Sequence, residues 1–314
     1  MRTLVTGAAG FIGSAYVRHL LGRQAGRVTV LDKLTYAGDP ANVPADPRVR
    51  FVKGDVCDTG LLAELVPGHD MVVNFAAETH VDRSIAGAAE FVRTNVVGTE
   101  ALLRAALDAG VGRFIQISTD EVYGSIDTGS WDETCPLKPN SPYAAAKAAA
   151  DLMALAYHRT HGMDVRITRC GNNYGPRQYP EKLIPLFVTN LLAGKKVPLY
   201  GDGRNVRDWV HVDDHCRGIL LVAENGAPGE VYNIGGGTEL TNHELTNHEL
   251  THLLLRACDA GPDMIDHVAD RPGHDRRYSL DDSKIRGLGY RPEVPFAEGL
   301  AATVQWYRAK GGPR

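Results

Sequence analysis

Cysteine is scarce in this sequence, and its spacing excludes two common kinds of site. The chain contains only Cys57, Cys135, Cys170, Cys216 and Cys258. Their number is odd, they are widely separated, and no two form a C-x-x-C pair, so neither a disulfide framework nor a structural zinc site is predicted. This usage favours a reducing compartment, and we expect a cytoplasmic protein.

Surplus positive charge and long apolar segments are also missing. Lysine and arginine number 34 against 38 acidic residues, which gives a formal net charge of −4. Nucleic-acid binding normally requires a basic surplus, so nucleic acid is not an expected partner. No apolar stretch approaches the roughly 18 residues of a membrane span, and no signal-peptide pattern is present, so no membrane attachment is expected. The remaining composition, with 43% hydrophobic residues, is that of an ordinary globular protein.

Short apolar runs alternate with helical patterns through the first part of the chain. This alternation is typical of βαβ units, and it predicts an α/β fold with a parallel, doubly wound sheet of the Rossmann type. The expected strands include residues 2–6, 27–32, 49–53, 70–76, 113–118 and 164–170, and the expected helices include 11–24, a long helix ending near 109, and 141–162.

Proline and glycine become frequent after residue 171, where the alternation becomes less regular. We therefore predict a Rossmann domain at 1–171 and a smaller C-terminal α/β substrate-binding domain at 172–314. Parts of about 206–235 are expected to return to the first domain, with residues 231–235 joining its sheet.

The stretch VTGAAGFIGS places Gly7, Gly10 and Gly13 between an expected strand and an expected helix. Glycine lets such a turn tighten and lets the backbone approach a pyrophosphate, which then lies at the helix N-terminus. Asp32 ends the next strand about 20 residues further on, as a dinucleotide fingerprint requires. A carboxylate there binds the adenosine ribose and repels a 2′-phosphate, so NAD is the predicted cofactor. The alternatives are an ordinary βα turn and a solvated strand end.

Tyr143 and Lys147 lie four residues apart in SPYAAAKAAA and therefore share one face of the expected helix. A phenol with a pKa near 10 is a poor base at neutral pH. We expect the neighbouring ammonium, with a positive nicotinamide ring, to favour the phenolate, which then takes a hydroxyl proton during hydride transfer. Packing and a solvated charge are the alternative for such a pair.

These motifs, with a Ser/Thr ahead of Y-x-x-x-K, resemble the extended short-chain dehydrogenase/reductases nearly end to end. Within that family the chain is similar to the dTDP-glucose 4,6-dehydratases, which are NAD-dependent lyases of deoxysugar biosynthesis. The resemblance implies a dTDP-glucose substrate, NAD, and a homodimer joined through two helices of each sheet domain. It is carried further by AAETHVDRS, STDEVYG, PNSPYAAAKA, NNYGPRQYPEKLIP, RDWVHVDDHCRGI and DRPGHDRRYS.

The stretch STDEVYG contains the residues that the resemblance assigns to catalysis. Removing water across C5 and C6 of a sugar needs a base for the C5 proton and an acid for the departing hydroxyl. The resemblance implies Glu121 as this base, Asp120 as this acid, and Tyr143 as the base for the C4 hydroxyl. Thr119 is expected to hydrogen-bond the C4 oxygen. Asp120 must then be protonated, which a nearby carboxylate favours; an acidic pair that caps a loop is the alternative.

The same resemblance implies a larger set of binding residues. Arg207 and Arg271 are candidates for the diphosphate, because guanidinium groups bind phosphate oxygens in a forked geometry. The alternatives are surface cations, capping residues, core alanines and, for His274, a structural histidine. Implied cofactor contacts are Gly7, Gly10, Phe11, Ile12, Gly13, Asp32, Lys33, Leu34, Thr35, Asp55, Val56, Phe75, Ala76, Ala77, Thr79, Thr94, Tyr143, Lys147 and Asn173. Implied substrate contacts are Thr79, Thr119, Asn172, Lys182, Leu183, Pro198, Tyr200, Arg207, Asn242, Arg271, His274 and Tyr278.

The stretch TNHELTNHEL, residues 241–250, is a tandem copy of five residues where relatives usually have one. Each copy begins Thr-x-x-Glu, so either Thr241 or Thr246 begins the helix. The preceding GGGTEL favours Asn242 as the ligand contact, whereas the register of the following helix favours Asn247.

The repeat also creates HELTH at residues 248–252, which matches the H-E-x-x-H pattern of zinc metalloproteases. We attribute the match to the duplication, because the other motifs indicate a nucleotide-sugar enzyme, and we predict no metal. The rival functions are a UDP-glucose dehydratase, a 4-epimerase or a decarboxylase on the same scaffold, and an NAD-sensing regulator.

Overall fold

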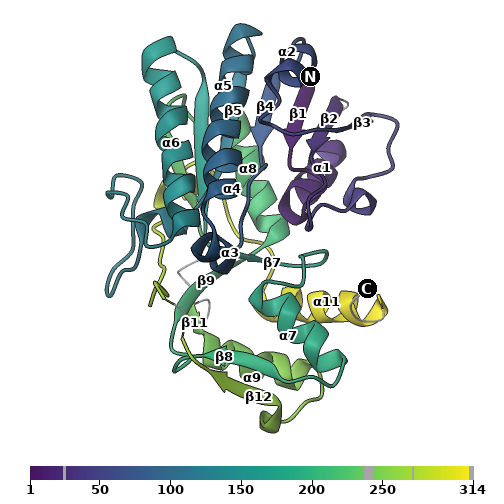
Figure 1. Cartoon of the computed structure of the whole chain (residues 1–314), viewed down its shortest axis with the longest axis vertical. Helices are drawn as coiled ribbons and strands as arrows, with labels where there is room; N and C mark the ends of the chain where they lie inside the picture. The colour runs from purple at the N-terminus through teal and green to yellow at the C-terminus, as the bar shows by residue number, and fades with distance from the viewer. Residues whose placement is uncertain (24–25, 237–243, 271, 311–314) are drawn as a thin grey trace.

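The computed structural model describes residues 1–23, 26–236, 244–270 and 272–310. Its larger body contains a seven-stranded sheet, ordered β10-β6-β5-β4-β1-β2-β3, in which the pairings are parallel (Figure 1). This is the doubly wound sheet predicted from the sequence. Its strands are β1 (Arg2–Thr6), β2 (Arg27–Asp32), β3 (Val49–Lys53), β4 (Met71–Asn74), β5 (Arg113–Thr119), β6 (Val165–Cys170) and β10 (Val231–Ile234).

Helices cover both faces of this sheet, so β4 and β6 are buried along their whole length. Successive residues of β1 enter different cores, because side chains alternate between the faces of a strand. Val5 packs with the helices of one face, and Leu4 packs with those of the other. The first face carries α1 (Phe11–Arg23), α8 (Val212–Asn225) and α10 (Ser283–Gly287), and the second carries α2 (Thr59–Leu65), α5 (Gly98–Asp108) and α6 (Pro142–His161).

The helix α6, which carries Tyr143 and Lys147, has clear signals at both ends. The hydroxyl of Ser141 accepts a hydrogen bond from the amide of Ala144 at 3.1 Å, and Pro142 occupies the first helical position. Gly162 ends the helix in the left-handed conformation, with φ of 69°. The two site residues therefore lie on a helix whose start is fixed one residue before Tyr143.

The long helix expected to end near residue 109 is broken. The chain forms α3 (Val81–Ala86), α4 (Ala89–Phe91), the π-helical turn η2 (Val92–Val97) and only then α5. Gly87 stops α3 in an extended conformation. An apolar periodicity does not show such an interruption, because the segments before and after it both pack against α6.

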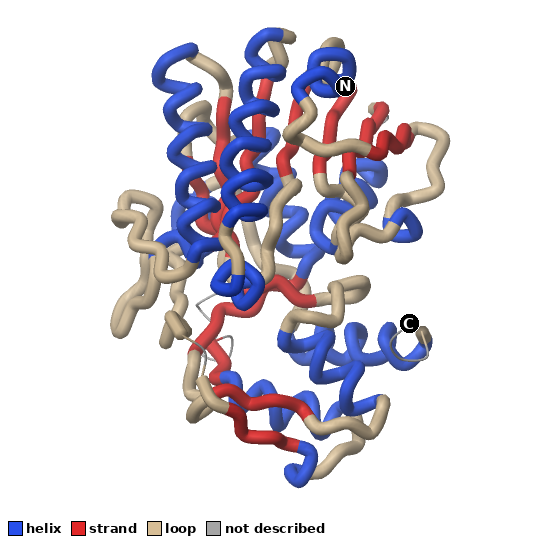
Figure 2. Tube along the Cα trace, in the orientation of Figure 1, coloured by secondary structure: helices blue, strands red, loops and turns tan. Residues whose placement is uncertain are grey.

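In the described residues, the smaller body contains two short sheets and three helices, which lie in the lower part of Figure 2. Its helices share one apolar core with Trp209. Between β9 and β11 the chain returns to the seven-stranded sheet through α8 and β10, and Val231 of β10 pairs with Ile167 of β6. The strands are β7 (Asn172–Tyr174), β8 (Val197–Tyr200), β9 (Val206–His211), β11 (Glu244–Thr246) and β12 (Ile265–Val268); the helices are α7 (Leu183–Leu192), α9 (Asn247–Ala257) and α11 (Phe296–Ala309); short 3-10 turns are η1 (Pro40–Asn42), η3 (Asp120–Tyr123) and η4 (Pro262–Met264).

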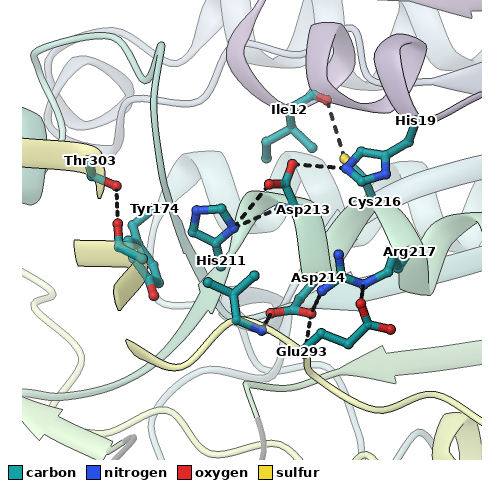
Figure 3. A network of polar contacts seen from close by, with 12 residues as sticks. Ile12, His19, Tyr174, His211, Asp213, Asp214, Cys216, Arg217, Glu293 and Thr303 are labelled. Carbon is teal, nitrogen blue, oxygen red and sulfur yellow. Dashed lines mark hydrogen bonds and ion pairs between the residues drawn. The ribbon is translucent and has the colours of Figure 1, made fainter. Parts of the chain in front are cut away.

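A polar network at the start of α8 joins the two bodies (Figure 3). The buried carboxylate of Asp214 accepts the backbone amides of Glu293 at 2.7 Å and Val294 at 3.1 Å, and it pairs with Arg217. The neighbouring Asp213 hydrogen-bonds His19 of α1 at 2.9 Å. Asp214 thus ties the segment before α11 to the sheet body.

Candidate active site

One cavity of about 450 Å³ opens at the carboxyl ends of the parallel strands, between the two bodies. This is where ligands bind in doubly wound sheets. Among the described residues, every predicted site residue except Leu34 and Tyr278 lines it. Asn242 and Arg271 lie outside the described residues. The cavity therefore brings together the predicted cofactor and substrate residues from both parts of the chain.

The glycine-rich turn is packed too closely for larger residues. Gly7 has φ of 66°, and a Cβ atom added there would lie 2.7 Å from the backbone nitrogen of Ala76. A Cβ atom at Gly13 would lie 2.6 Å from the carbonyl oxygen of Gly7. The turn is thus shaped by glycine, as a backbone that approaches a pyrophosphate requires.

Asp32 is buried rather than a solvated strand end. Its two carboxylate oxygens accept the backbone amides of Ala9 and Leu34, each at 2.8 Å. The carboxylate keeps acceptor capacity for ribose hydroxyls, because two oxygens offer about four acceptor sites. Leu34, predicted as a cofactor contact, donates this backbone hydrogen bond to Asp32 and is absent from the described cavity wall, so its contact with the cofactor stays a prediction.

Polar atoms without partners lie in the cavity wall. Within the described part of the chain, Oγ1 of Thr94 and Oδ1 of Asn172 are buried and accept or donate no hydrogen bond. Buried polar groups are normally satisfied, and a polar ligand would satisfy these. The wall therefore fits a cofactor with amide, hydroxyl and phosphate groups.

The acidic pair follows the end of β5. Thr119 caps η3, and its hydroxyl accepts the amide of Glu121 at 3.3 Å and donates to Oδ1 of Asp120 at 3.2 Å. Asp120 is 2% exposed. Burial, followed by the charges of Glu121 and Asp208, raises the pKa of Asp120 well above its ordinary value. A carboxyl that keeps its proton in this way can act as an acid.

Tyr143 and Lys147 are both buried in the same wall, but their interaction differs from the one expected. The ammonium of Lys147 donates to the carbonyl oxygen of Ile117 at 2.5 Å. Burial, then Glu121 and Asp120, raises the pKa of Tyr143 well above its ordinary value, while a hydrogen bond with Thr119 lowers it. Burial lowers the pKa of Lys147 to about 8, against the effect of Asp151. The expected lowering of the phenol pKa by Lys147 together with a nicotinamide ring stays a prediction.

The substrate side of the cavity is built by the smaller body. Arg207 is buried and its guanidinium lies 4.3 Å from the ring centroid of Tyr278. Tyr278 in turn donates to Asp275 at 2.6 Å. Tyr278, predicted as a substrate contact, thus lies behind Arg207 and holds it. The other predicted substrate residues in this wall are Asn172, Lys182, Leu183, Pro198, Tyr200 and His274.

The second copy of the duplicated segment begins the helix α9. Thr246 is its N-cap, and a capping box joins Thr246 to Glu249 in both directions. Asn247 is buried in the cavity wall, and its Oδ1 has no hydrogen-bond partner in the described residues. The register that favoured Asn247 is therefore the one that the helix adopts, while Thr241 of the first copy lies outside the described residues.

Sequence reasoning missed several residues of the wall, among them Glu78, His80, Tyr179, Glu181 and His215. His215 is the clearest case. Its Nδ1 lies 2.9 Å from Oδ1 of Asn173, and burial lowers its pKa to about 3, so it is neutral. No spacing pattern in the sequence indicates the contact between His215 and Asn173, because these residues are 42 positions apart and meet only in the fold.

Comparisons with known proteins agree with this geometry. A family model described as GDP-mannose 4,6 dehydratase matches residues 4–303. A dTDP-glucose 4,6-dehydratase of Streptomyces antibioticus is 64% identical, over 98% of this chain and 92% of its own. The crystal structure of a dTDP-glucose 4,6-dehydratase from Streptomyces venezuelae with NAD bound has 65% identity and a TM-score of 0.95, covering 98% of this chain and 97% of that one.

The fold alone would not separate the rival activities. A UDP-glucose 4-epimerase from Thermotoga maritima has a TM-score of 0.91 but only 33% identity, with 99% of both chains covered. The dehydratases match far more closely in sequence over nearly the same length. The chain therefore belongs to the GDP-mannose 4,6 dehydratase family and, within it, to the dTDP-glucose 4,6-dehydratases.

Proposed function

We propose that this chain converts dTDP-glucose to dTDP-4-keto-6-deoxyglucose for deoxysugar biosynthesis, with NAD as a recycled cofactor. The observation that carries the proposal is the pair Asp120 and Glu121 beside Tyr143 in the wall of one cavity. A 4-epimerase needs the tyrosine and a hydroxyl donor, whereas elimination of water needs an additional acid and base. The acidic pair supplies both.

The residues that would hold NAD come from the sheet body. The turn of Gly7, Gly10 and Gly13 would receive the pyrophosphate, Asp32 the adenosine ribose, and Asp55 with Val56 the adenine. When bound, NAD accepts the hydride from C4 of the sugar and later returns it to C6. Every predicted residue for this role except Leu34 borders the cavity in the described chain.

The protein groups then divide the proton transfers. Tyr143 takes the proton of the C4 hydroxyl while Thr119 hydrogen-bonds its oxygen. The resulting C4 ketone acidifies the C5 proton, which Glu121 removes. Asp120 protonates the C6 hydroxyl, which leaves as water, and Glu121 returns its proton to C5. The proton gained by Tyr143 replaces, through solvent, the one that Asp120 gave.

Tyr143 must lose its proton despite a raised pKa. Burial and the two carboxylates oppose the phenolate, and Lys147 contacts a carbonyl oxygen instead. A positive nicotinamide ring beside the phenol would act in the opposite direction. We therefore assign the activation of Tyr143 to the cofactor charge together with Lys147, rather than to Lys147 alone.

Isotope transfer tests the reaction directly. With dTDP-glucose deuterated at C4, the label should appear at C6 of a keto-deoxy product. Label that stays at C4, or no turnover, would contradict the proposal. Faster turnover of UDP-glucose than of dTDP-glucose would favour the UDP-glucose rival, and an inactive chain that binds NAD would favour the regulator.

We further propose that the chain forms a homodimer and works in the cytoplasm. Val92 and Val97 of η2 and Leu152 of α6 are 49%, 52% and 56% exposed. Apolar side chains this exposed on η2, which leads directly into α5, and on α6 support a contact with a second copy through the face on which α5 and α6 lie side by side in Figure 1. Among the described helices, none combines the length and apolar character needed to span a membrane.

A further inference from the structure

A short segment of the chain, residues 177–182, reaches from the end of β7 to the cofactor side of the cavity. Glu181 is its central contact. The phenol of Tyr36 donates to Oε1 of Glu181 at 3.1 Å, and the guanidinium of Arg83 lies 3.4 Å from its Oε2. His80 lies 3.9 Å from the same oxygen. Glu181 has a side chain only 11% exposed, whereas that of Arg83 is 51% exposed, so the carboxylate is shielded from solvent and Arg83 lies at the surface.

The neighbours of Glu181 reinforce this connection. Arg83 lies over the ring of Tyr36, with 3.7 Å between its guanidinium carbon and the ring centroid. Tyr179 meets Tyr36 edge to face at 5.4 Å. The ammonium of Lys182 donates to the carbonyl oxygen of Thr79 at 2.7 Å. Tyr179, Glu181 and Lys182 thus join the segment to parts of the chain about 100 to 145 residues away.

The segment and the loop that carries Tyr36 both contribute to the cavity wall. Tyr179, Glu181 and Lys182 line the cavity, and so do Lys33 and Thr35, which precede Tyr36 by one to three residues. Burial and then the carboxylate of Glu181 raise the pKa of Tyr36, so the phenol remains a hydrogen-bond donor. The contacts around Glu181 therefore join two stretches of the wall that surrounds a molecule bound in this part of the cavity.

We propose that Glu181 is a positioning residue that retains NAD between the two hydride transfers by holding residues 177–182 across the cofactor channel. The inference rests on the proposed function. In that reaction, the hydride taken from C4 must return to C6 of the same sugar. Escape of the reduced cofactor would therefore leave an oxidised sugar that cannot be reduced at C6. A direct tie between the two walls lowers the escape rate without touching the reacting atoms.

Cofactor release from the full-length protein tests this inference without any sugar. In Glu181→Gln and in Tyr36→Phe, NADH dissociation, followed by the loss of its fluorescence when excess NAD is added, should accelerate by about tenfold, the effect of one lost charge-assisted hydrogen bond. Glu230→Gln is the matched control, because it removes an exposed carboxylate that pairs with Lys284 at 2.6 Å. NADH should dissociate from this control at the wild-type rate. An unchanged rate in Glu181→Gln would overturn the inference.

A second measurement separates retention from a merely structural role. Glu181→Gln should lose turnover after gel filtration and regain it when NAD is added in excess, with thermal unfolding unchanged. The wild type should respond weakly to added NAD. Turnover that stays low at saturating NAD would overturn the inference. Because dissociation is measured without sugar, faster release in a chain that shows no dehydratase activity would contradict only the proposed function.

Discussion

The hydroxyl of Thr119 donates to Oδ1 of Asp120 at 3.2 Å, while Oδ2 of Asp120 is buried with no hydrogen-bond partner among the described residues. One oxygen is therefore held by the protein and the other remains to carry the proton for a departing hydroxyl. Asp120 is itself one of the residues that line the cavity.

Asp120→Asn should stop the reaction after C4 oxidation. An amide cannot protonate the C6 hydroxyl, so we expect kcat to fall by about 10² to 10⁴. Reduced cofactor should accumulate when the variant is mixed with dTDP-glucose, which its near-ultraviolet absorbance reports. Asp127→Asn, in an exposed loop, is the control and should turn over normally. Full activity of Asp120→Asn would remove Asp120 from the mechanism.

The raised pKa of Asp120 predicts a pH dependence. The carboxyl must be protonated to act, so elimination should be fastest below the folded-state pKa and should decline as pH rises through it. The free energy of unfolding depends on pH in the same direction. Because the folded state holds this proton more tightly, the contribution of Asp120 to the free energy of unfolding falls as pH rises from its unfolded-state pKa to its folded-state pKa. Asp120→Asn should therefore resist urea better than the wild type at pH 8. A wild type that is the more stable of the two would contradict the buried, protonated carboxyl.

The sheet was predictable because its signals are local. The glycine turn, Asp32 and the apolar runs each occupy a few consecutive residues, and the resemblance supplied most of the cavity wall. Contacts such as Tyr36 with Glu181 were not predictable, because they depend on how two distant loops meet. Leu34 and Tyr278 were placed by motif position, and neither lines the cavity, so their contacts with a ligand stay predictions.

Asn247 should be the ligand contact of the duplicated segment. Its buried Oδ1 has no partner in the described chain and belongs to the cavity wall. Asn247→Ala should raise KM for dTDP-glucose by about 5- to 100-fold, the range for losing one or more hydrogen bonds to a ligand, with kcat less affected. Asn242→Ala should leave KM unchanged. Steady-state kinetics decide between them, and the reverse result would return the role to Asn242.

The polar network at the start of α8 predicts that substitutions at two adjacent residues lower the free energy of unfolding by different amounts. Asp214 is 2% exposed and accepts two backbone amides, so Asp214→Ala leaves these donors and Arg217 unpaired and should cost about 3–5 kcal/mol of unfolding free energy. Asp213 has a side chain that is 43% exposed, so Asp213→Ala should lower the free energy of unfolding by less than about 1 kcal/mol. Urea unfolding measures both. Equal losses would mean that Asp214 does not join the two bodies.

The exposed apolar residues of the second helical face predict how the dimer can be split. Leu152, 56% exposed on α6, would be buried against a second copy. Leu152→Lys places a charge in that contact, which is costly without a partner, so the mass measured by light scattering should fall to that of one chain. Phe51→Lys is the matched control, because Phe51 is 38% exposed but lies on β3 at the edge of the sheet. It should leave the dimer intact. A Leu152→Lys protein that remains dimeric would place the interface elsewhere on the surface.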